Sequence, residues 1–108
     1  MSDISKLIKV GNLLSTYKDL LSSTQQEILS SYYTYNLSIS EIASERNISR
    51  AAVEDALSKG VKKLEEFEKN LKIVEKNEEI LKITAKLKQN SEIKEDIEKI
   101  ERIIDNGI

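Results

Sequence analysis

The chain has 108 residues, with 17 Lys and Arg, 19 Asp and Glu, a formal net charge of −2, and no His, Cys, Trp or Pro. Without Cys and His, disulfides, zinc sites, thiol nucleophiles and imidazole bases are excluded. Three Gly, no Pro and 33% charged residues are typical of helices joined by short turns. We therefore expect a single soluble, cytoplasmic all-α domain that is not an enzyme and uses no metal or cofactor. No membrane span or signal peptide is recognisable.

The first segment repeats apolar residues at three- and four-residue steps, which predicts a helix from about Asp3 to Ser22. Thr24 and Glu27 then have the spacing of a capping box, in which two side chains satisfy free N–H groups of a first helical turn. The helix that this box opens should end near Asn36, because asparagine tolerates a left-handed backbone.

This second predicted helix carries three tyrosines, Tyr32, Tyr33 and Tyr35. Exposed tyrosines can stack on unpaired bases, which would make this helix part of a surface for single-stranded nucleic acid. Their helical spacing beside Ile28 and Leu29 instead favours a place in the hydrophobic core.

The segment from Ile39 to Ser58 has the form of a helix-turn-helix motif. Ser38 and Glu41 repeat the capping-box spacing before a short helix that should end at about Arg46, and Ser49 caps a second helix. The motif needs a small residue where its helices touch, a left-handed residue in the turn, and apolar residues on either side. These positions are filled, in that order, by Ala43, by Asn47, and by Ile42, Ile48, Val53 and Ala56.

Residues 59–108 are predicted to form a helical arm on a motif core of residues 24–58, within one domain. The helix that starts after Ser49 has no clear stop before Asn77, and Asn90-Ser91 predicts a stop and a new cap. Its apolar positions follow a heptad, and isoleucines continue at similar spacing after residue 90. The heptad positions are Val53, Leu57, Gly60, Leu64, Phe67, Leu71, Val74, Leu81 and Ala85, and the isoleucines are Ile93, Ile97, Ile100 and Ile104.

The heptad seam needs a partner face, because an isolated helix is marginal in water. One partner is the amino-terminal helix of the same chain, and the other is a second subunit, as is common for sustained heptads. We favour a homodimer on this seam. The sequence leaves open whether the segment after Asn90 folds back on the body.

Residues in and around the motif resemble two known families. Leu20–Leu29, with Tyr32-Tyr33 and Leu37–Ala43 after it, resembles region four of bacterial sigma factors, which binds promoter DNA through the second helix of its motif. The similarity to the YlxM family of small bacterial helix-turn-helix proteins is closer and covers about residues 10–85. That similarity rests on Tyr32-Tyr33, Ser38–Ala43, Asn47-Ile48-Ser49-Arg50, Ala52-Val53 and Leu64–Leu71.

The YlxM resemblance implies a non-enzymatic accessory or regulatory role linked to the bacterial signal recognition particle, with the particle's protein or RNA as partner. The sigma-factor resemblance implies an alternative, a DNA-binding transcription regulator. A third interpretation is a purely structural helical adaptor that binds partners through the heptad seam. All three share an all-α fold with an amino-terminal helix, a helix-turn-helix of the sigma region-four type and a long helical carboxy-terminal arm.

Nucleic-acid contacts would come from the second helix of the motif. The candidate residues are Ser49, Arg50, Glu54, Ser58, Lys59, Lys62 and Lys63, with Ala51 and Asp55 also facing outward. Affinity for duplex DNA comes mostly from Lys and Arg at phosphates, yet the outward positions of residues 49–58 hold one Arg and two carboxylates. Carboxylates can accept from cytosine only once phosphate contacts hold the protein on DNA. This surface therefore favours the accessory role over DNA binding.

Overall fold

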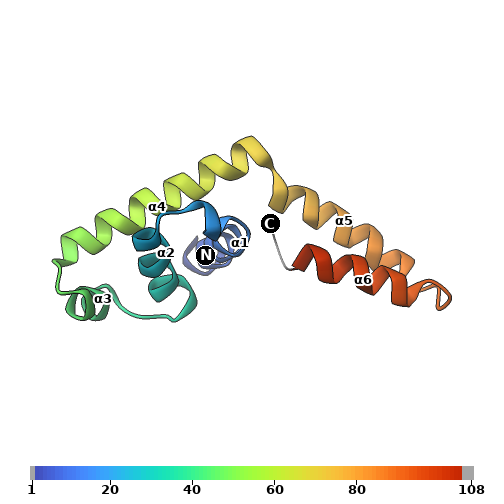
Figure 1. Ribbon diagram of the computed structural model, residues 1–108, viewed down its shortest axis with the longest axis horizontal. Helices are drawn as coiled ribbons and strands as arrows, with labels where there is room; N and C mark the ends of the chain where they lie inside the picture. The colour runs from blue at the N-terminus through green and yellow to red at the C-terminus, as the bar shows by residue number, and fades with distance from the viewer. Residues whose placement is uncertain (1, 106–108) are drawn as a thin grey trace.

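The computed structural model describes residues 2–105, with side chains from residue 4 onward, and within this range it is all-α (Figure 1). The α-helices are α1 (Ser2–Tyr17), α2 (Ser23–Leu29), α3 (Ile39–Arg46), α4 (Arg50–Leu71), α5 (Ile73–Leu87) and α6 (Lys94–Asp105). A 3-10 turn, η1 (Lys18–Leu20), follows α1, and a π-helical segment, η2 (Ser30–Thr34), extends α2. None of the helices in the described range is long and apolar enough to cross a membrane. The predicted all-α fold with a helical arm is confirmed.

The helices are arranged along an arch formed by α4 and α5 (Figure 1). Helices α1, α2 and α3 pack against α4, and the α3–α4 corner lies at one end of the molecule. At the other end α6 folds back against α5, which answers the question of where the segment after Asn90 lies. The molecule measures 56 × 30 × 25 Å, so the helix-turn-helix and the α5–α6 hairpin are well separated.

The hydrophobic core lies between α1, α2, α3 and the amino-terminal two thirds of α4. Its buried members are Val10, Leu13, Leu14, Tyr17, Leu21, Ile28, Leu29, Ile42, Ala43, Val53, Leu57 and Leu64. The heptad seam from Val53 to Leu64 therefore packs on helices of the same chain, so this stretch is not available to a second subunit. Further along, Leu71 and Ala85 are exposed, which means that the seam does not continue as one buried stripe.

Gly60 lies where α4 packs on α2, and it is buried. A Cβ atom at this position would lie 2.5 Å from Leu29 Cδ1 and 3.1 Å from Leu29 Cγ. Gly11 in α1 is different, because a Cβ there has nothing within 4 Å. Close contact with Leu29 therefore requires a glycine at position 60, whereas packing does not require one at position 11.

Gly11→Ala and Gly60→Ala are expected to change stability in opposite directions. Gly11→Ala should raise the free energy of unfolding by about 0.5–1 kcal/mol, because alanine loses less backbone entropy in a helix. Gly60→Ala gains the same term but must displace the Leu29 side chain in a packed core, at a cost of about 1–3 kcal/mol. Urea unfolding of both variants measures the change in the free energy of unfolding, which should be positive for Gly11→Ala and negative for Gly60→Ala. A stabilised Gly60→Ala would contradict the close α2–α4 contact.

The helix ends before the motif differ from the prediction. α1 ends at Tyr17, and Ser22 has an extended backbone with φ −65° and ψ 159°. Ser22 Oγ accepts from the Gln25 N–H at 3.2 Å, and Gln25 Oε1 accepts from the Ser22 N–H at 3.2 Å. The predicted capping box of Thr24 and Glu27 is therefore wrong. The helix starts two residues earlier, and its capping box is formed by Ser22 and Gln25.

The three tyrosines lie in and just after η2, the π-helical segment that extends α2. Tyr32 and Tyr33 are half-buried, pack against the core and have ring centroids 4.9 Å apart. Tyr35 is 72% exposed, so its predicted place in the core is wrong. The π-helical turn of η2 shifts the side chains after it away from α-helical spacing, which carries Tyr35 off the core face. Asn36 has the predicted left-handed backbone, with φ 57°.

The long helix after Ser49 is broken at Lys72, five residues before the predicted stop. Lys72 has φ 55° and ends α4, and α5 begins at the next residue. The break is held by a group that we call the Tyr17–Glu68 latch. Glu68 Oε1 accepts from the Tyr17 hydroxyl and from the Val74 N–H at 3.1 Å, and Glu68 Oε2 accepts from the Glu75 N–H at 3.1 Å. The Tyr17 hydroxyl accepts in turn from the Ile73 N–H at 3.1 Å.

The α5–α6 hairpin is joined by polar contacts between the end of α5 and α6. Thr84 Oγ1 donates to Glu101 Oε2 at 2.7 Å, and Lys88 Nζ pairs with Glu101 Oε1 at 2.8 Å. These two hydrogen bonds hold the pKa of the Glu101 carboxyl below its usual value.

The turn of the hairpin differs slightly from the prediction. Asn90 Oδ1 accepts from the Glu92 N–H at 3.0 Å, and α6 starts at Lys94, so the predicted cap at Ser91 is too early. Of the four predicted isoleucines, Ile97 is buried, Ile93 and Ile104 are half-buried, and Ile100 is 43% exposed. Two helices alone do not enclose all four side chains.

Candidate nucleic-acid interface

Helices α3 and α4 form the predicted helix-turn-helix. Ser38 Oγ accepts from the Glu41 N–H at 3.1 Å, and Glu41 Oε1 accepts from the Ser38 N–H at 3.0 Å. These hydrogen bonds also lower the pKa of the Glu41 carboxyl. Asn47 ends α3 with φ 55°, and Ser49 Oγ accepts from the Ala52 N–H at 3.0 Å and caps α4. The predicted caps and the left-handed turn residue are confirmed.

The turn is held to α3 by its backbone. The Ile48 N–H donates to the Ala43 carbonyl at 3.0 Å, and Ala43, Ile42 and Val53 are buried as predicted. The Ile48 side chain is 39% exposed, so its predicted place in the core is wrong. The short turn carries the chain across the end of α3, which leaves this side chain at the rim of the motif. Ala56 is half-buried.

All seven candidate residues are exposed: Ser49, Arg50, Glu54, Ser58, Lys59, Lys62 and Lys63. They do not form one surface. Glu54, Ser58 and Lys62 recur at four-residue spacing and line a groove of about 530 Å³. Lys59 lies on a neighbouring row, where Lys59 Nζ pairs with Asp55 Oδ2 at 3.0 Å.

The groove beside α4 also contains residues that the sequence analysis missed. Lys6 of α1, Tyr33 of η2, Ile39 of α3, and Leu57, Val61 and Glu65 of α4 complete its lining. Burial raises the pKa of the Tyr33 hydroxyl, which therefore stays protonated. No sequence signal near the motif points to Lys6, because its position depends on how α1 packs on α4.

The charges around the groove largely cancel. Lys6 and Lys62 face the same space as Glu54 and Glu65, and the positive charge of Lys59 is already paired with Asp55. Binding to a duplex requires several cations free to meet phosphates. The surface of the second motif helix is thus mixed in sign, as expected from the sequence.

A second groove of about 490 Å³ lies between η1, α2, η2 and α3. It is polar and contains an ion pair between Arg46 Nη1 and Glu27 Oε1 at 3.0 Å, with Lys18, Glu45 and Tyr35 nearby. Within the described part of the chain, no group of three or more Asp, Glu, Cys or His residues is placed to hold a metal ion.

Comparison with known proteins identifies the family. Residues 4–103 match the UPF0122 family, described as "Putative helix-turn-helix protein, YlxM / p13 like". The chain belongs to this family. A UPF0122 protein of Fusobacterium nucleatum is 37% identical over 97 residues, which cover 90% of this chain and 93% of the relative. UPF0122 proteins of Bacillus cereus and Bacillus anthracis are 35% identical over 108 residues, covering 93% of this chain and 98% of each relative.

No solved structure matches the chain. The match to the YlxM family confirms the resemblance seen in the sequence, and it spans nearly the whole chain rather than residues 10–85 alone. For this UPF0122 protein, the sigma-factor likeness of the motif stays a prediction.

Proposed function

We propose that this protein is a non-enzymatic accessory or regulatory helix-turn-helix protein of the bacterial signal recognition particle pathway, acting through the particle's protein or RNA. The observation that supports this best is the mixed charge of the exposed side of α4, where Glu54 and Asp55 lie among the cations and Asp55 pairs with Lys59. Such a surface is poorly suited to the phosphates of a duplex. Paired charges of both signs suit a protein surface, whose own charges of both signs can complement them. The particle itself is suggested by the YlxM resemblance.

The proposal is tested by binding of the purified protein to three probes: the particle's protein, its small RNA, and mixed genomic duplex fragments. We expect association with the particle's protein or RNA that survives about 150 mM salt, where surface charges are screened beyond about 8 Å. The duplex fragments should bind weakly and dissociate steeply as salt rises. Binding to neither particle component above background would overturn the proposal.

A DNA-binding transcription regulator is the second candidate. Arg50 favours it, because this exposed residue lies in the first turn of α4, where a recognition helix places side chains against base edges. Within the described residues, no carboxylate lies within ion-pair distance of Arg50, so its guanidinium is free to meet a base or a phosphate.

If DNA is the target, Arg50→Ala should cost about 1–3 kcal/mol of specific affinity. Lys63→Ala should weaken binding to all sequences alike and lower the salt slope by about one. Arg102→Ala is the matched control, because Arg102 is an exposed arginine on α6, and α6 packs on α5, away from the α3–α4 corner (Figure 1). Fluorescence anisotropy against a selected duplex measures all three. Equal affinity for Arg50→Ala and the unchanged protein would remove this candidate.

A further inference from the structure

The α5–α6 hairpin has one largely apolar flank and one charged flank. The apolar part of the first, which we call the hairpin face, consists of Ile80, Ile83, Leu87, Ile100 and Ile103, each 40–71% exposed. The exposed Lys76 and Asp96 lie on the same helical rows, one turn before Ile80 and Ile100. The opposite flank carries Glu78, Lys82, Glu98, Arg102 and Asp105. Large apolar side chains gathered on one exposed flank are unusual for a surface that stays in water.

The helical register places these five side chains together. Thr84 faces α6, as its hydrogen bond to Glu101 shows. Ile80 lies four residues before Thr84 and Leu87 lies three residues after it. Both side chains are therefore on the same side of the Thr84–Glu101 contact. Ile100 lies three residues after the buried Ile97. In an antiparallel helix pair the corresponding flanks of the two helices lie on the same side, so Ile100 and Ile80 share a surface.

The body of the same chain does not cover the hairpin face. Where α1 approaches the hairpin, the groove between them is lined by Val74, Asn77, Glu78, Leu81 and Ile104. These residues belong to the inner side and the charged flank of the hairpin. The hairpin face is turned elsewhere, and every one of its members is at least 40% exposed in the monomer.

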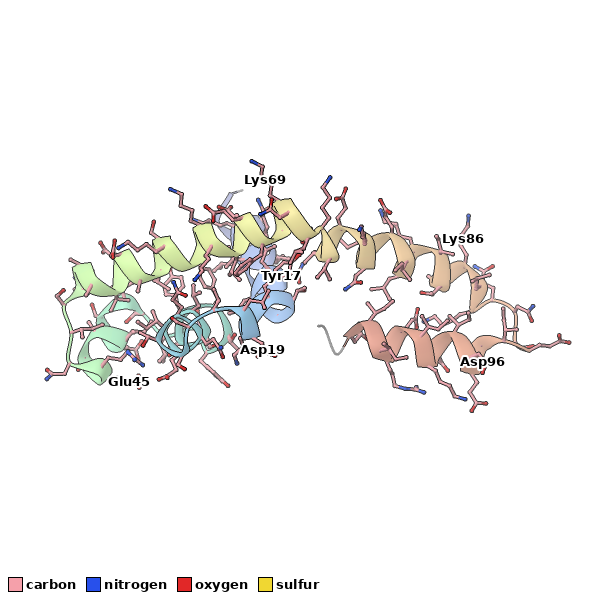
Figure 2. All side chains as sticks on the ribbon, turned by 45° about the horizontal axis from the view of Figure 1, so that its top comes forward. Tyr17, Asp19, Glu45, Lys69, Lys86 and Asp96 are labelled. Atoms are coloured by element: carbon pink, nitrogen blue, oxygen red, sulfur yellow. The ribbon has the colours of Figure 1, made fainter. Side chains whose placement is uncertain are left out.

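The charges beside the hairpin face indicate what would cover it. The apolar stripe of α5 has the 3-4 spacing of a coiled coil, with Ile80, Ile83 and Leu87 as its members. Two charged residues, Glu79 and Lys86, lie beside this stripe. They are seven residues apart and so occupy the same heptad position. Figure 2 shows Lys86 on the side of α5 away from α6. If two α5 helices lie antiparallel about a two-fold axis near Ile83, Glu79 of each meets the partner's Lys86. The same operation places Ile80 opposite the partner's Leu87.

We propose that a second copy of this chain covers the hairpin face, with α5 antiparallel to the partner's α5 in a four-helix bundle. This moves the predicted homodimer from the α4 seam, which is covered up to Leu64, to the hairpin. The two helix-turn-helix motifs lie at the far ends of the assembly and remain free for the partners of the proposed function. At 15 residues α5 is about 22 Å long, so the interface is small for a stable dimer, and its dissociation constant is expected in the micromolar range.

Sedimentation velocity of the full chain tests the proposal between about 1 and 200 μM. The mass should rise with concentration towards twice the 12.3 kDa of the chain. Ile83→Glu should stay monomeric at all these concentrations while its far-UV circular dichroism matches that of the unchanged protein. Ile4→Glu is the matched control, because Ile4 is an isoleucine of similar exposure on α1, 67% against 59% for Ile83, and it should dimerise normally.

A charge exchange tests the antiparallel register. Lys86→Glu replaces two attractive pairs with repulsion and should weaken dimerisation about tenfold, and adding Glu79→Lys should restore it. A monomeric unchanged protein at every concentration would overturn the proposal, whether or not another protein binds this face. Equal dimerisation of Ile83→Glu and Ile4→Glu would also overturn it. Failure of the double exchange to restore dimerisation would overturn the α5–α5 arrangement.

Discussion

Leu64→Glu is expected to unfold the protein, whereas Leu71→Glu, seven residues further along α4, is expected to leave it folded. Both residues belong to the same predicted heptad seam, but Leu64 is 0% exposed and Leu71 is 44% exposed. At position 64 the change removes a packed aliphatic side chain, at about 2–5 kcal/mol, and buries a carboxylate without a partner. Together these costs approach the whole stability of a small domain, about 5–15 kcal/mol.

The carboxylate of Leu71→Glu remains in water, so we expect its free energy of unfolding to change by less than about 1 kcal/mol. Far-UV circular dichroism and urea unfolding compare the two variants directly. The comparison also bears on the structural adaptor hypothesis, which places partner binding on the whole seam. Only Leu71→Glu tests that hypothesis, because loss of binding by an unfolded Leu64→Glu says nothing about contacts. A folded, stable Leu64→Glu would show that the core does not close over α4.

Tyr17→Phe is expected to destabilise the protein by about 1–3 kcal/mol, the cost of leaving the part-buried Ile73 N–H without its acceptor and the Glu68 carboxylate with two of its three hydrogen bonds. Tyr17 is fully buried, and its ring packs on Phe67 with centroids 5.8 Å apart. Phenylalanine keeps this packing and removes only the hydroxyl. The Ile73 N–H then lacks its acceptor, and Glu68 lacks its shortest hydrogen bond.

Glu68→Ala should cost about 2–4 kcal/mol, because the carboxylate accepts three hydrogen bonds and caps the first turn of α5. The double variant Tyr17→Phe/Glu68→Ala should lose less than the sum of the two single changes, since the residues act on the same helix end. Urea unfolding supplies all three values. Strict additivity would contradict the Tyr17–Glu68 latch.

Tyr33→Phe is the control for the loss of a hydroxyl. The Tyr33 ring is half-buried, and its hydroxyl has no hydrogen-bond partner among the residues that the structure describes. Its removal should therefore change the free energy of unfolding by less than about 0.5 kcal/mol. If Tyr33→Phe and Tyr17→Phe lowered the free energy of unfolding equally, the hydrogen bonds of the Tyr17–Glu68 latch would not contribute to stability.

The contribution of Tyr17 should also depend on pH. Burial and then the hydrogen bond to Glu68 raise the pKa of the Tyr17 hydroxyl above its usual 10.0. A raised pKa in the folded state means that protonated Tyr17 stabilises the fold below pH 10 and that this contribution is lost as the pH rises through the raised value. The difference in free energy of unfolding between the unchanged protein and Tyr17→Phe should thus be constant near neutral pH and should become smaller in strong alkali.

Local sequence rules predicted the helix-turn-helix in detail. Ser38, Glu41, Asn47 and Ser49 act on backbone groups within three residues of themselves, so their roles follow from spacing alone. The exposure of the candidate binding residues followed from the same helical register. Their division into a groove row and an ion-paired row did not, because the groove is completed by Lys6 and Tyr33 from distant segments.

The sequence by itself determined the helical class, the position of the motif and the family. The tertiary structure decided the rest, and its clearest instance is the end of α4. Lys72 itself does not signal a break, since lysine favours a helix and rarely adopts a left-handed backbone. The break exists because Tyr17, 55 residues earlier, and Glu68 supply the hydrogen bonds that the first turn of α5 requires. The two hydrogen bonds that Glu68 accepts from α5 are local, but Tyr17 meets Ile73 and Glu68 only when α1 has packed against α4, and no local pattern encodes that meeting.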